Sequence, residues 1–289
     1  MKKNPPGKYY SLTKLFIKSA ILFFACLIPG RIFSQTLKGN VISEDTKTGI
    51  GFVNIGIIGR NIGTVADKSG HYSLNITRIS DKDSLRFSMI GYDSKSYLVG
   101  EFRKDSTRDV YLSQRVYCIP EFTVVYRKPR KIELGTRVTS DELRSGFGSN
   151  DLGSELAIKV HSKSRVRLED INLNVSICTY DSVTYRLNIY QSTNNKDYSN
   201  ILNEPVYLSF TKDKIREAIT FDLTKYSIIV EGDIMVALEL YRDLGEGRLL
   251  FHTEYFIGTT YHRKSNTGTW SEAAGVVGMY LRGVKISKE

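Results

Sequence analysis

The chain has 289 residues, of which 41% are hydrophobic and 25% are charged, and its formal net charge is +10. This hydrophobic content excludes a disordered protein, and the length leaves room for two ordinary domains. The positive charge would favour nucleic acid as a partner only if it were spread along the whole chain.

The N-terminal segment is basic and then apolar. The apolar run "AILFFACLIPG" (20–30) follows five lysines and is shorter than the roughly 20 residues that a membrane-spanning helix needs. Small Ser34 stands before Gln35, so the pattern predicts a secretory signal peptide over residues 1–34. Two alternatives stay open: an uncleaved anchor, and a lipoprotein modified at Cys26, although "LFFA" before that cysteine is a poor match to a lipidation site.

Removal of the signal changes the charge argument. Residues 1–34 contain six basic residues and no acidic one, so the net charge falls from +10 to +4. This argues against nucleic acid as a partner. The predicted location is the periplasm, the outer membrane or the cell surface, with membrane contact only through an uncleaved signal.

Two cysteines remain after residue 34, Cys118 and Cys178. An oxidising compartment permits a disulfide between them. We expect two separate thiols instead, because Cys118 is near a predicted domain boundary. Cys178 shares strand parity with Asn172 and Asn174, which predicts that it faces away from the apolar core.

From residue 36 onward the sequence predicts short strands separated by turns rich in Gly, Asp, Ser and Lys. No helical period is present. This spacing is typical of an all-β sandwich. The strands expected here cover 36–42, 51–59, 63–66, 71–76, 84–90, 96–100, 109–113 and 122–126.

A boundary is predicted at the basic, proline-containing run "RKPRK" (127–131). Residues 133–155 lack steady alternation and are interpreted as a long connection with one helical turn at "SDELR" (140–144). The predicted organisation is a first sandwich at 35–126, a linker at 127–154 and a second sandwich at 155–289.

The second half alternates more clearly between apolar and polar residues. Such spacing indicates strands with one buried face, and many of them with polar loops favour an antiparallel, jelly-roll-like sandwich. The alternating apolar sets are Ile171, Leu173, Val175 and Ile177; Tyr185, Leu187 and Ile189; Ile219, Phe221 and Leu223; and Ile234, Val236, Leu238 and Leu240.

Residues 36–112 resemble the carboxypeptidase regulatory-like domain, a transthyretin-like sandwich of exported proteins in Bacteroidota. The resemblance rests on "LKGNVI", "GFVNIGIIGRNIGTVAD", "DKSGHYSLNI" and "MIGYDSKSYLV". Gly51 replaces the usual proline before the second strand, and Ala66 replaces the usual Thr or Ser before the aspartate. The resemblance implies a sandwich of seven to eight strands. Residues 133–289 are similar to a C-terminal sandwich of unassigned role.

The segment "IGTVADKSGHYSLNI" (62–76) is interpreted as a β-hairpin. Asp67 is placed to accept backbone N–H groups of the turn, and Gly70 to take a positive φ. A calcium role for Asp67 would need several more oxygen ligands beside it. We therefore expect Asp67 and Gly70 to be structural turn residues.

No catalytic, metal or cofactor site is predicted. None of His71, His161, His252 and His262 begins an H-x-x-E or H-E-x-x-H pattern, which a zinc peptidase would need. No G-x-S-x-G elbow is present. The glycines of "GIIGRNIG" (56–63) are assigned to strand ends and a turn, because the Lys-Ser/Thr ending of a phosphate loop is missing.

Two groups of residues keep a binding hypothesis. The basic runs 127–131 and 159–167 could meet acidic glycans or lipopolysaccharide phosphates, although a solvated surface is the simpler interpretation. Aromatic rings with neighbouring polar groups are a common way to bind sugars, and core packing explains such rings as well. The candidate glycan contacts are Tyr255, Tyr261, His262 and Trp270.

These observations favour a non-catalytic, exported protein of the cell envelope that binds or scaffolds through β-sandwich domains. One alternative is a carbohydrate-binding module in residues 133–289. Another is an adhesin or envelope-assembly partner that uses exposed strand edges.

Overall fold

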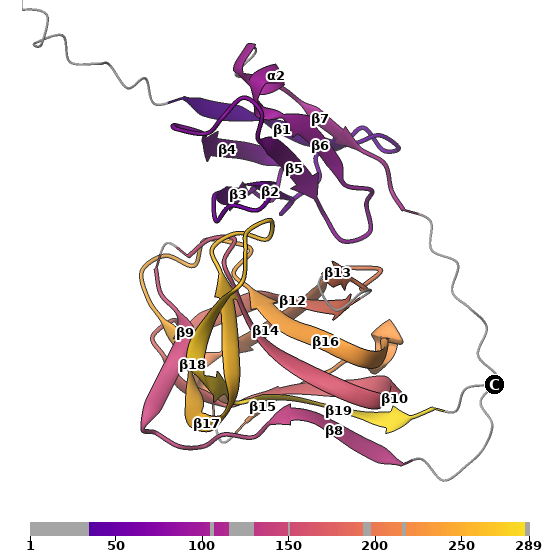
Figure 1. Ribbon diagram of the computed structural model, residues 1–289, viewed down its shortest axis with the longest axis vertical. Coiled ribbons are helices and arrows are strands. Elements are labelled where there is room, and N and C mark those ends of the chain that lie inside the picture. Colours follow the sequence, from indigo (N-terminus) through magenta and orange to yellow (C-terminus); the bar gives the residue numbers. More distant parts are fainter. Residues whose placement is uncertain are drawn as a thin grey trace, which may run out of the picture. The chain divides into compact units, whose positions relative to one another are not determined.

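The computed structural model describes residues 35–104, 107–115, 130–149, 151–192, 198–215 and 218–286 (Figure 1). The predicted signal at 1–34, Cys118 and the strand expected at 122–126 lie outside these residues. Within the described ranges one short α-helix, α2 (Val99–Lys104), accompanies many strands. The prediction of an all-β fold is confirmed.

The first part of the chain forms two sheets. A three-stranded sheet has the order β4-β1-β7, and a four-stranded sheet has the order β3-β2-β5-β6, counted over the described residues. The strands are β1 (Thr36–Ser43), β2 (Asn54–Ile57), β3 (Gly63–Val65), β4 (His71–Asn75), β5 (Ser84–Ser88), β6 (Lys95–Leu98) and β7 (Val110–Leu112).

Alternating side chains build the core of this first sandwich. In β4, Tyr72 and Leu74 are buried while their neighbours are exposed. The rings of Phe87 from β5 and Phe102 from α2 stack with centroids 5.8 Å apart, and both are fully buried. Burial of each such ring contributes about 1.5–3 kcal/mol. Residues 99–100, expected to continue a strand, instead begin α2 because Val99 and Phe102, one helical turn apart, both reach this core.

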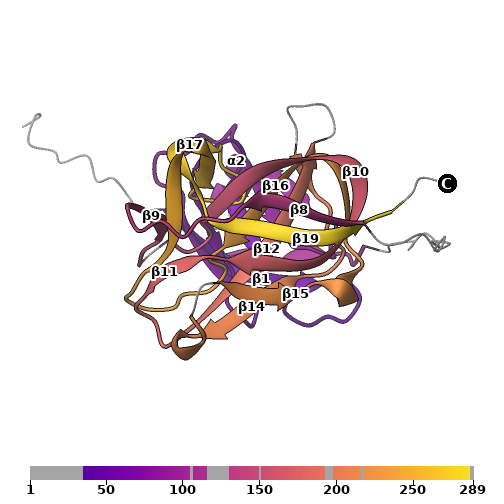
Figure 2. The same cartoon turned by 90° about the horizontal axis from the view of Figure 1, so that it is seen from below.

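The second part of the chain forms one twelve-stranded hydrogen-bonded sheet system, again counted over the described residues. Figure 2 shows β8, β19 and β10 side by side, in agreement with their pairing. The strands are β8 (Lys131–Thr136), β9 (Leu143–Phe147), β10 (Glu155–Leu173), β11 (Val175–Cys178), β12 (Ser182–Ser192), β13 (Tyr198–Asn200), β14 (Val206–Thr211), β15 (Ile219–Asp222), β16 (Ile229–Glu239), β17 (Leu249–Arg263), β18 (Ser271–Val277) and β19 (Met279–Lys285). Two short 3-10 turns, η1 (Lys212–Lys214) and η2 (Thr224–Tyr226), lie between strands.

Strand β10 connects the two layers of this second sandwich. Its first half pairs with β16 and β17, and its second half pairs mainly with β19 and β15. Register shifts after Ser162 and after Leu168 allow the strand to bend between these partners. The layers enclose a core that includes Leu168, Leu187 and Val236.

The interpretation of residues 133–155 as a strandless connection is wrong. Strand β8 pairs with β19, and β9 pairs with β17. Residues 143–147 of β9 take the place of the expected helical turn. Both strands are short and only partly buried, so their sequences carry little of the alternation by which a strand is recognised.

The hairpin expected at 62–76 is also wrong. Strand β3 belongs to the four-stranded sheet and β4 to the three-stranded sheet, so the turn between them joins two sheets. Cys178 is a further correction, because it is buried against the core rather than facing away from it. A register shift between Val175 and Ile177 reverses the face that the alternation predicted. Burial raises the pKa of the Cys178 thiol.

Candidate functional site

The outer face of the four-stranded sheet is polar. Asn54 on β2 lies opposite Ser88 on β5, and Gly56 lies opposite Arg86, which places Asn54, Ser88 and Arg86 on one face. The alternating residues of β2 and β5 point into the core from the other face. Because side chains alternate between the two faces of a strand, the amide of Asn54, the hydroxyl of Ser88 and the guanidinium of Arg86 all point away from the core.

Two polar atoms on this face are buried without a partner. Asn54 is only 7% exposed, and neither its Oδ1 nor the Ser88 Oγ has a hydrogen-bond partner among the described residues. An unpaired buried polar group costs about 1–3 kcal/mol. Such atoms are rare in folded proteins. Because Asn54 and Ser88 both line a pocket wall, a rotation of either side chain would turn its covered atom towards a ligand, which makes the two residues candidate ligand contacts.

A second polar surface is formed by β12 and β16. Arg186 donates from Nε to Glu239 Oε2 at 3.0 Å and from Nη2 to Oε1 at 2.7 Å. Both side chains are almost completely buried. Arg186 Nη1 also donates to the Phe52 carbonyl at 2.8 Å. This two-point geometry is the arrangement in which a buried arginine best neutralises a carboxylate.

Glu155 on β10 is the centre of an adjoining group. It accepts from Asn188 Nδ2 at 2.5 Å and from Tyr190 OH at 2.6 Å, and it forms an ion pair with Arg263 on β17. Asn188 Nδ2 also donates to Glu239 Oε2 at 2.7 Å, so its amide joins the two carboxylates. We call Glu155, Arg186, Asn188, Tyr190, Glu239 and Arg263 the buried polar network.

Electrostatics inside the network follow from burial and from its ion pairs. Burial raises the pKa of Glu155, while Arg263 acts in the opposite direction. Burial also raises the pKa of Tyr190 well above its ordinary value, so its hydroxyl keeps its proton. Burial acts to lower the pKa of Arg263, but the Glu155 carboxylate outweighs it and the net direction is upward. The tyrosine is therefore a fixed donor and the arginine a fixed cation.

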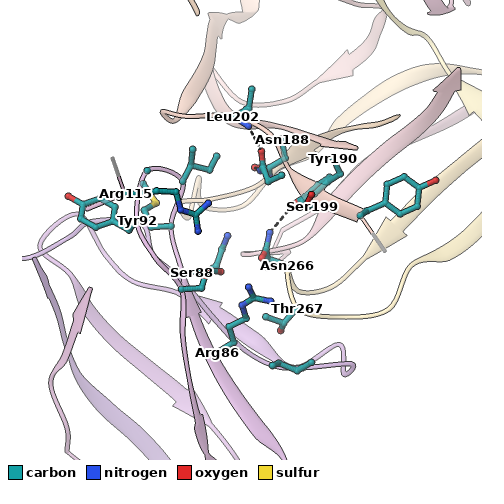
Figure 3. A pocket seen from close by; sticks show the side chains of 18 of the residues that line it. Arg86, Ser88, Tyr92, Arg115, Asn188, Tyr190, Ser199, Leu202, Asn266 and Thr267 are labelled. Carbon is teal, nitrogen blue, oxygen red and sulfur yellow. Dashed lines mark hydrogen bonds between the residues drawn. The ribbon is translucent and has the colours of Figure 1, made fainter. Parts of the chain in front are cut away.

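A pocket of about 550 Å³ lies over these two surfaces. The described residues from Thr36 onward form one compact unit, and the pocket belongs to it. Figure 3 shows Arg86 and Arg115 pointing into the pocket, with Tyr190 and Asn266 on its wall. We call this space the polar pocket. Its volume is within the range of sites that hold small-molecule ligands.

The wall of the polar pocket is positively charged. Among its described lining residues are three arginines, Arg86, Arg115 and Arg263, and no Asp or Glu. Arg115 is paired with Asp93 at 2.9 Å and Arg263 with Glu155. Arg86 forms no ion pair with any described residue. One guanidinium is thus left to attract an anion.

The structure brings only two of the four candidate glycan contacts together. Trp270 and Tyr261 belong to one cluster, which also includes Tyr190 and Tyr198. The Trp270 ring lies 4.2 Å from the Arg263 guanidinium carbon and contacts the Tyr190 ring edge-on at 6.2 Å. The Tyr261 and Trp270 rings pack beside the buried polar network and are partly buried.

Tyr255 and His262 lie elsewhere. Tyr255 is 43% exposed and contacts the ring of Phe256, which is fully exposed. His262 follows Tyr261 along β17 and is exposed, because consecutive residues of a strand point to opposite faces.

The turn residues Asp67 and Gly70 hold the connection between β3 and β4. Asp67 Oδ1 accepts from the backbone N–H of Ser69 at 2.7 Å and of His71 at 3.0 Å. Gly70 has a φ of +89°. His71 lies beside Asp67 at the surface and not in the polar pocket.

The glycine-rich stretch 56–63 has a role that the sequence did not predict. A Cβ on Gly56 would lie 2.1 Å from Thr267 Oγ1, and one on Gly63 would lie 2.2 Å from Ser265 Oγ. These two glycines allow the 265–267 loop to approach β2 and β3, and Gly59 N donates to the Thr267 carbonyl at 2.9 Å. Gly59, with a φ of +74°, has the expected turn role, and Gly63 is at an expected strand end because it begins β3.

Sequence reasoning missed the buried polar network. Arg186, Asn188 and Tyr190 alternate with Tyr185, Leu187 and Ile189, so the alternation predicted one buried face and one solvated face. Strand β12 is instead buried on both faces over most of its length. A strand that is buried on both faces and contains an arginine has the same alternation as a strand with one solvated face. The alternation alone therefore does not distinguish the two.

In the part of the chain that the structure describes, no group of three or more His, Cys, Asp or Glu side chains is placed to hold a metal ion. In the same ranges no helix is long and apolar enough to cross a membrane.

Comparisons with known proteins give little beyond one domain. No curated protein matches the chain. A mutant VP2 protein of infectious bursal disease virus is 10% identical, with 82% of this chain and 59% of that chain covered and a TM-score of 0.17. A VP2 subviral particle of the same virus is 9% identical, with 82% and 61% covered and a TM-score of 0.14. The chain therefore spans about three fifths of the length of these viral proteins, and the TM-scores carry no argument about its fold.

The family comparison agrees with the first sandwich. Seven described strands, β1 to β7, form its two sheets. This type of domain is regulatory and non-catalytic. Residues 37–124 match the model of the CarboxypepD_reg-like domain, and the described residues of this range form a β-sandwich domain of that kind.

Proposed function

We propose that the chain is a non-catalytic protein, exported to the cell envelope, that binds a small polar ligand in the polar pocket. The observation that carries the proposal is the wall of that pocket. Asn54 is buried and its Oδ1 lacks a partner, as does Ser88 Oγ, and both line a space of about 550 Å³. A bound ligand would provide these hydrogen bonds and recover the desolvation cost.

The buried polar network supports binding rather than catalysis. Its two carboxylates are each paired with an arginine, and Glu155 accepts two further hydrogen bonds. A general acid or base must exchange protons with a substrate, and these groups are occupied by fixed donors. Their effect is to hold Tyr190, Asn188 and Arg263 rigidly beneath the ligand, which lowers the entropic cost of binding.

Export is proposed from the N-terminal pattern of residues 1–34 and from the domain type at 37–124. Such domains in exported proteins of Bacteroidota suggest that group of bacteria as the source. Cell fractionation with mass spectrometry of the isolated protein checks this part. We expect an envelope protein whose mass corresponds to a start at Gln35, and a full-length cytoplasmic product would contradict export.

Ligand binding is tested by a thermal-shift screen of the purified protein against sugars, sugar acids, amino acids and nucleotides. We expect hits whose stabilisation is lost in Ser88→Phe, which places a ring in the pocket. The matched control is Ser209→Phe, since Ser209 lines a different cavity on β14. A screen without hits, or hits that Ser88→Phe leaves unchanged, would remove the proposal.

A second candidate is an adhesin or assembly partner, favoured by an exposed apolar segment. Tyr255, Phe256 and Ile257 on β17 are 43%, 101% and 57% exposed, at a place where the register with β18 slips. Exposed apolar groups of this kind often mark contacts with other proteins. Cross-linking in intact cells should capture a partner with the natural protein and lose it with Phe256→Ser. Recovery of the same products from both would tell against this role.

A further inference from the structure

The polar pocket contains the chemistry to recognise one class of ligand. We infer that it binds an acidic sugar, meaning a polyhydroxylated ligand that also carries a carboxylate or a phosphate. The inference rests on the proposed function and adds the ligand class to it. Each residue that supports this inference is described by the structure and lines the polar pocket.

The positive charge of the pocket wall favours a ligand that carries an anionic group. Arg86 projects from the outer face of β5 and forms no ion pair with a described residue, and no Asp or Glu lines the pocket. Figure 3 shows Arg86 and Arg115 pointing into the same space. A guanidinium presents a planar set of donors that matches a carboxylate or a phosphate.

Hydrogen-bond acceptors without a partner on the pocket wall favour a ligand that carries hydroxyl groups. Asn54 Oδ1 is a buried acceptor without a donor, and Ser88 Oγ beside it can both donate and accept. A fully ionised anion without hydroxyl groups leaves the Asn54 carbonyl oxygen unsatisfied, because it has no proton to donate. A ligand that meets Asn54 and Arg86 together must carry a hydrogen-bond donor and a negative charge, and the hydroxyl groups and the acid group of an acidic sugar supply both.

The remaining wall fits a sugar of limited size. Asn266 Nδ2 donates to Tyr190 OH at 2.9 Å, and no described residue donates to its Oδ1. Tyr92 and Tyr198 add ring surface to the lining, and aromatic rings can pack on the apolar faces of sugars. Tyr190 OH is already bonded to Glu155, Arg263 and Asn266, so it positions Asn266 rather than the ligand.

Isothermal titration of the purified protein with four probes tests the inference. The probes are digalacturonate, galactose 1-phosphate, neutral galactobiose and inorganic phosphate. We expect one or both of the charged sugars to bind at least tenfold more tightly than galactobiose and than inorganic phosphate. The two charged sugars distinguish a carboxylate from a phosphate as the recognised group.

The test variant is Arg86→Gln, which removes the charge from an exposed position without an ion pair. Affinity for the charged sugar should fall about tenfold to hundredfold, the range expected for charge-assisted hydrogen bonds. Affinity for galactobiose should be unchanged. The matched control is Arg167→Gln, an exposed arginine in the basic run 159–167 and outside the polar pocket, which should bind every probe as the natural protein does.

Some results would contradict the acidic-sugar assignment without contradicting the proposed function. Equal binding of galactobiose, an unchanged affinity in Arg86→Gln, or no binding of either charged sugar would overturn the acidic-sugar assignment. Equal binding of inorganic phosphate would overturn it too, because the sugar would then add nothing to the recognition of the anion. If the thermal-shift screen still finds ligands that Ser88→Phe abolishes, the proposed function stands and only the ligand class is lost.

Discussion

Two features of the structure disfavour any residue other than glycine at position 70. Its φ of +89° disfavours residues with a Cβ, and a Cβ there would lie 2.6 Å from the Val41 carbonyl oxygen. The turn motif predicted this residue and Asp67 from the sequence, because Asp and Gly in a polar segment have specific backbone roles. The motif could not reveal that the two strands separate into different sheets.

Gly70→Ala should lower the free energy of unfolding by about 1–3 kcal/mol, from backbone strain and from the clash with Val41. Gly59→Ala is the control, since Gly59 has a φ of +74° and no atom lies within 4 Å of the position that its Cβ would take. Urea unfolding measures both. Equal losses in the two variants would show that the clash with Val41 has no cost.

At the scale of elements, the alternation of apolar and polar residues predicted some strands of the second sandwich and missed others. It predicted strands at 185–189, 219–223 and 234–240, and at 171–175 as far as the register shift of β11, because each buries an apolar face in one core. It failed for β8 and β9, which are short, and for the polar face of β12. A buried face with charges looks like a solvated face in sequence, since only the partner strands decide which one it is.

Arg186→Met should lower the free energy of unfolding by about 3–5 kcal/mol, because it leaves the Glu239 carboxylate buried without its cation. Arg186→Met combined with Glu239→Leu should recover part of that loss. The control is Arg282→Met, which breaks a partly exposed pair with Asp170 and should cost at most about 1 kcal/mol. Urea unfolding of these variants, of Glu239→Leu and of the natural protein gives the coupling energy, and an additive double variant would contradict the pairing.

For the molecule as a whole, the fold was more predictable than the site. Ordered motifs in residues 36–112 indicated the first sandwich, which the match at 37–124 supports. The polar pocket combines Asn54 and Arg86 with Asn188 and Asn266, which are far apart in the sequence. No local pattern joins such residues, and the sequence instead directed attention to aromatic residues, of which only Tyr261 and Trp270 lie near the buried polar network.

Asn54 is where the binding account and a purely structural account differ most. If the buried Oδ1 exists for a ligand, Asn54→Leu removes an unsatisfied polar group and should leave stability unchanged or raise it by up to about 1–3 kcal/mol. If Asn54 instead supports the fold, the same change should destabilise the protein.

The most direct test of the central claim is calorimetric titration of Asn54→Leu with the ligand that best stabilises the natural protein in the thermal-shift screen. We predict an affinity at least tenfold weaker than that of the natural protein, in a variant that unfolds at the same or a higher urea concentration. Binding of Asn54→Leu with the affinity of the natural protein would contradict a ligand site at the polar pocket.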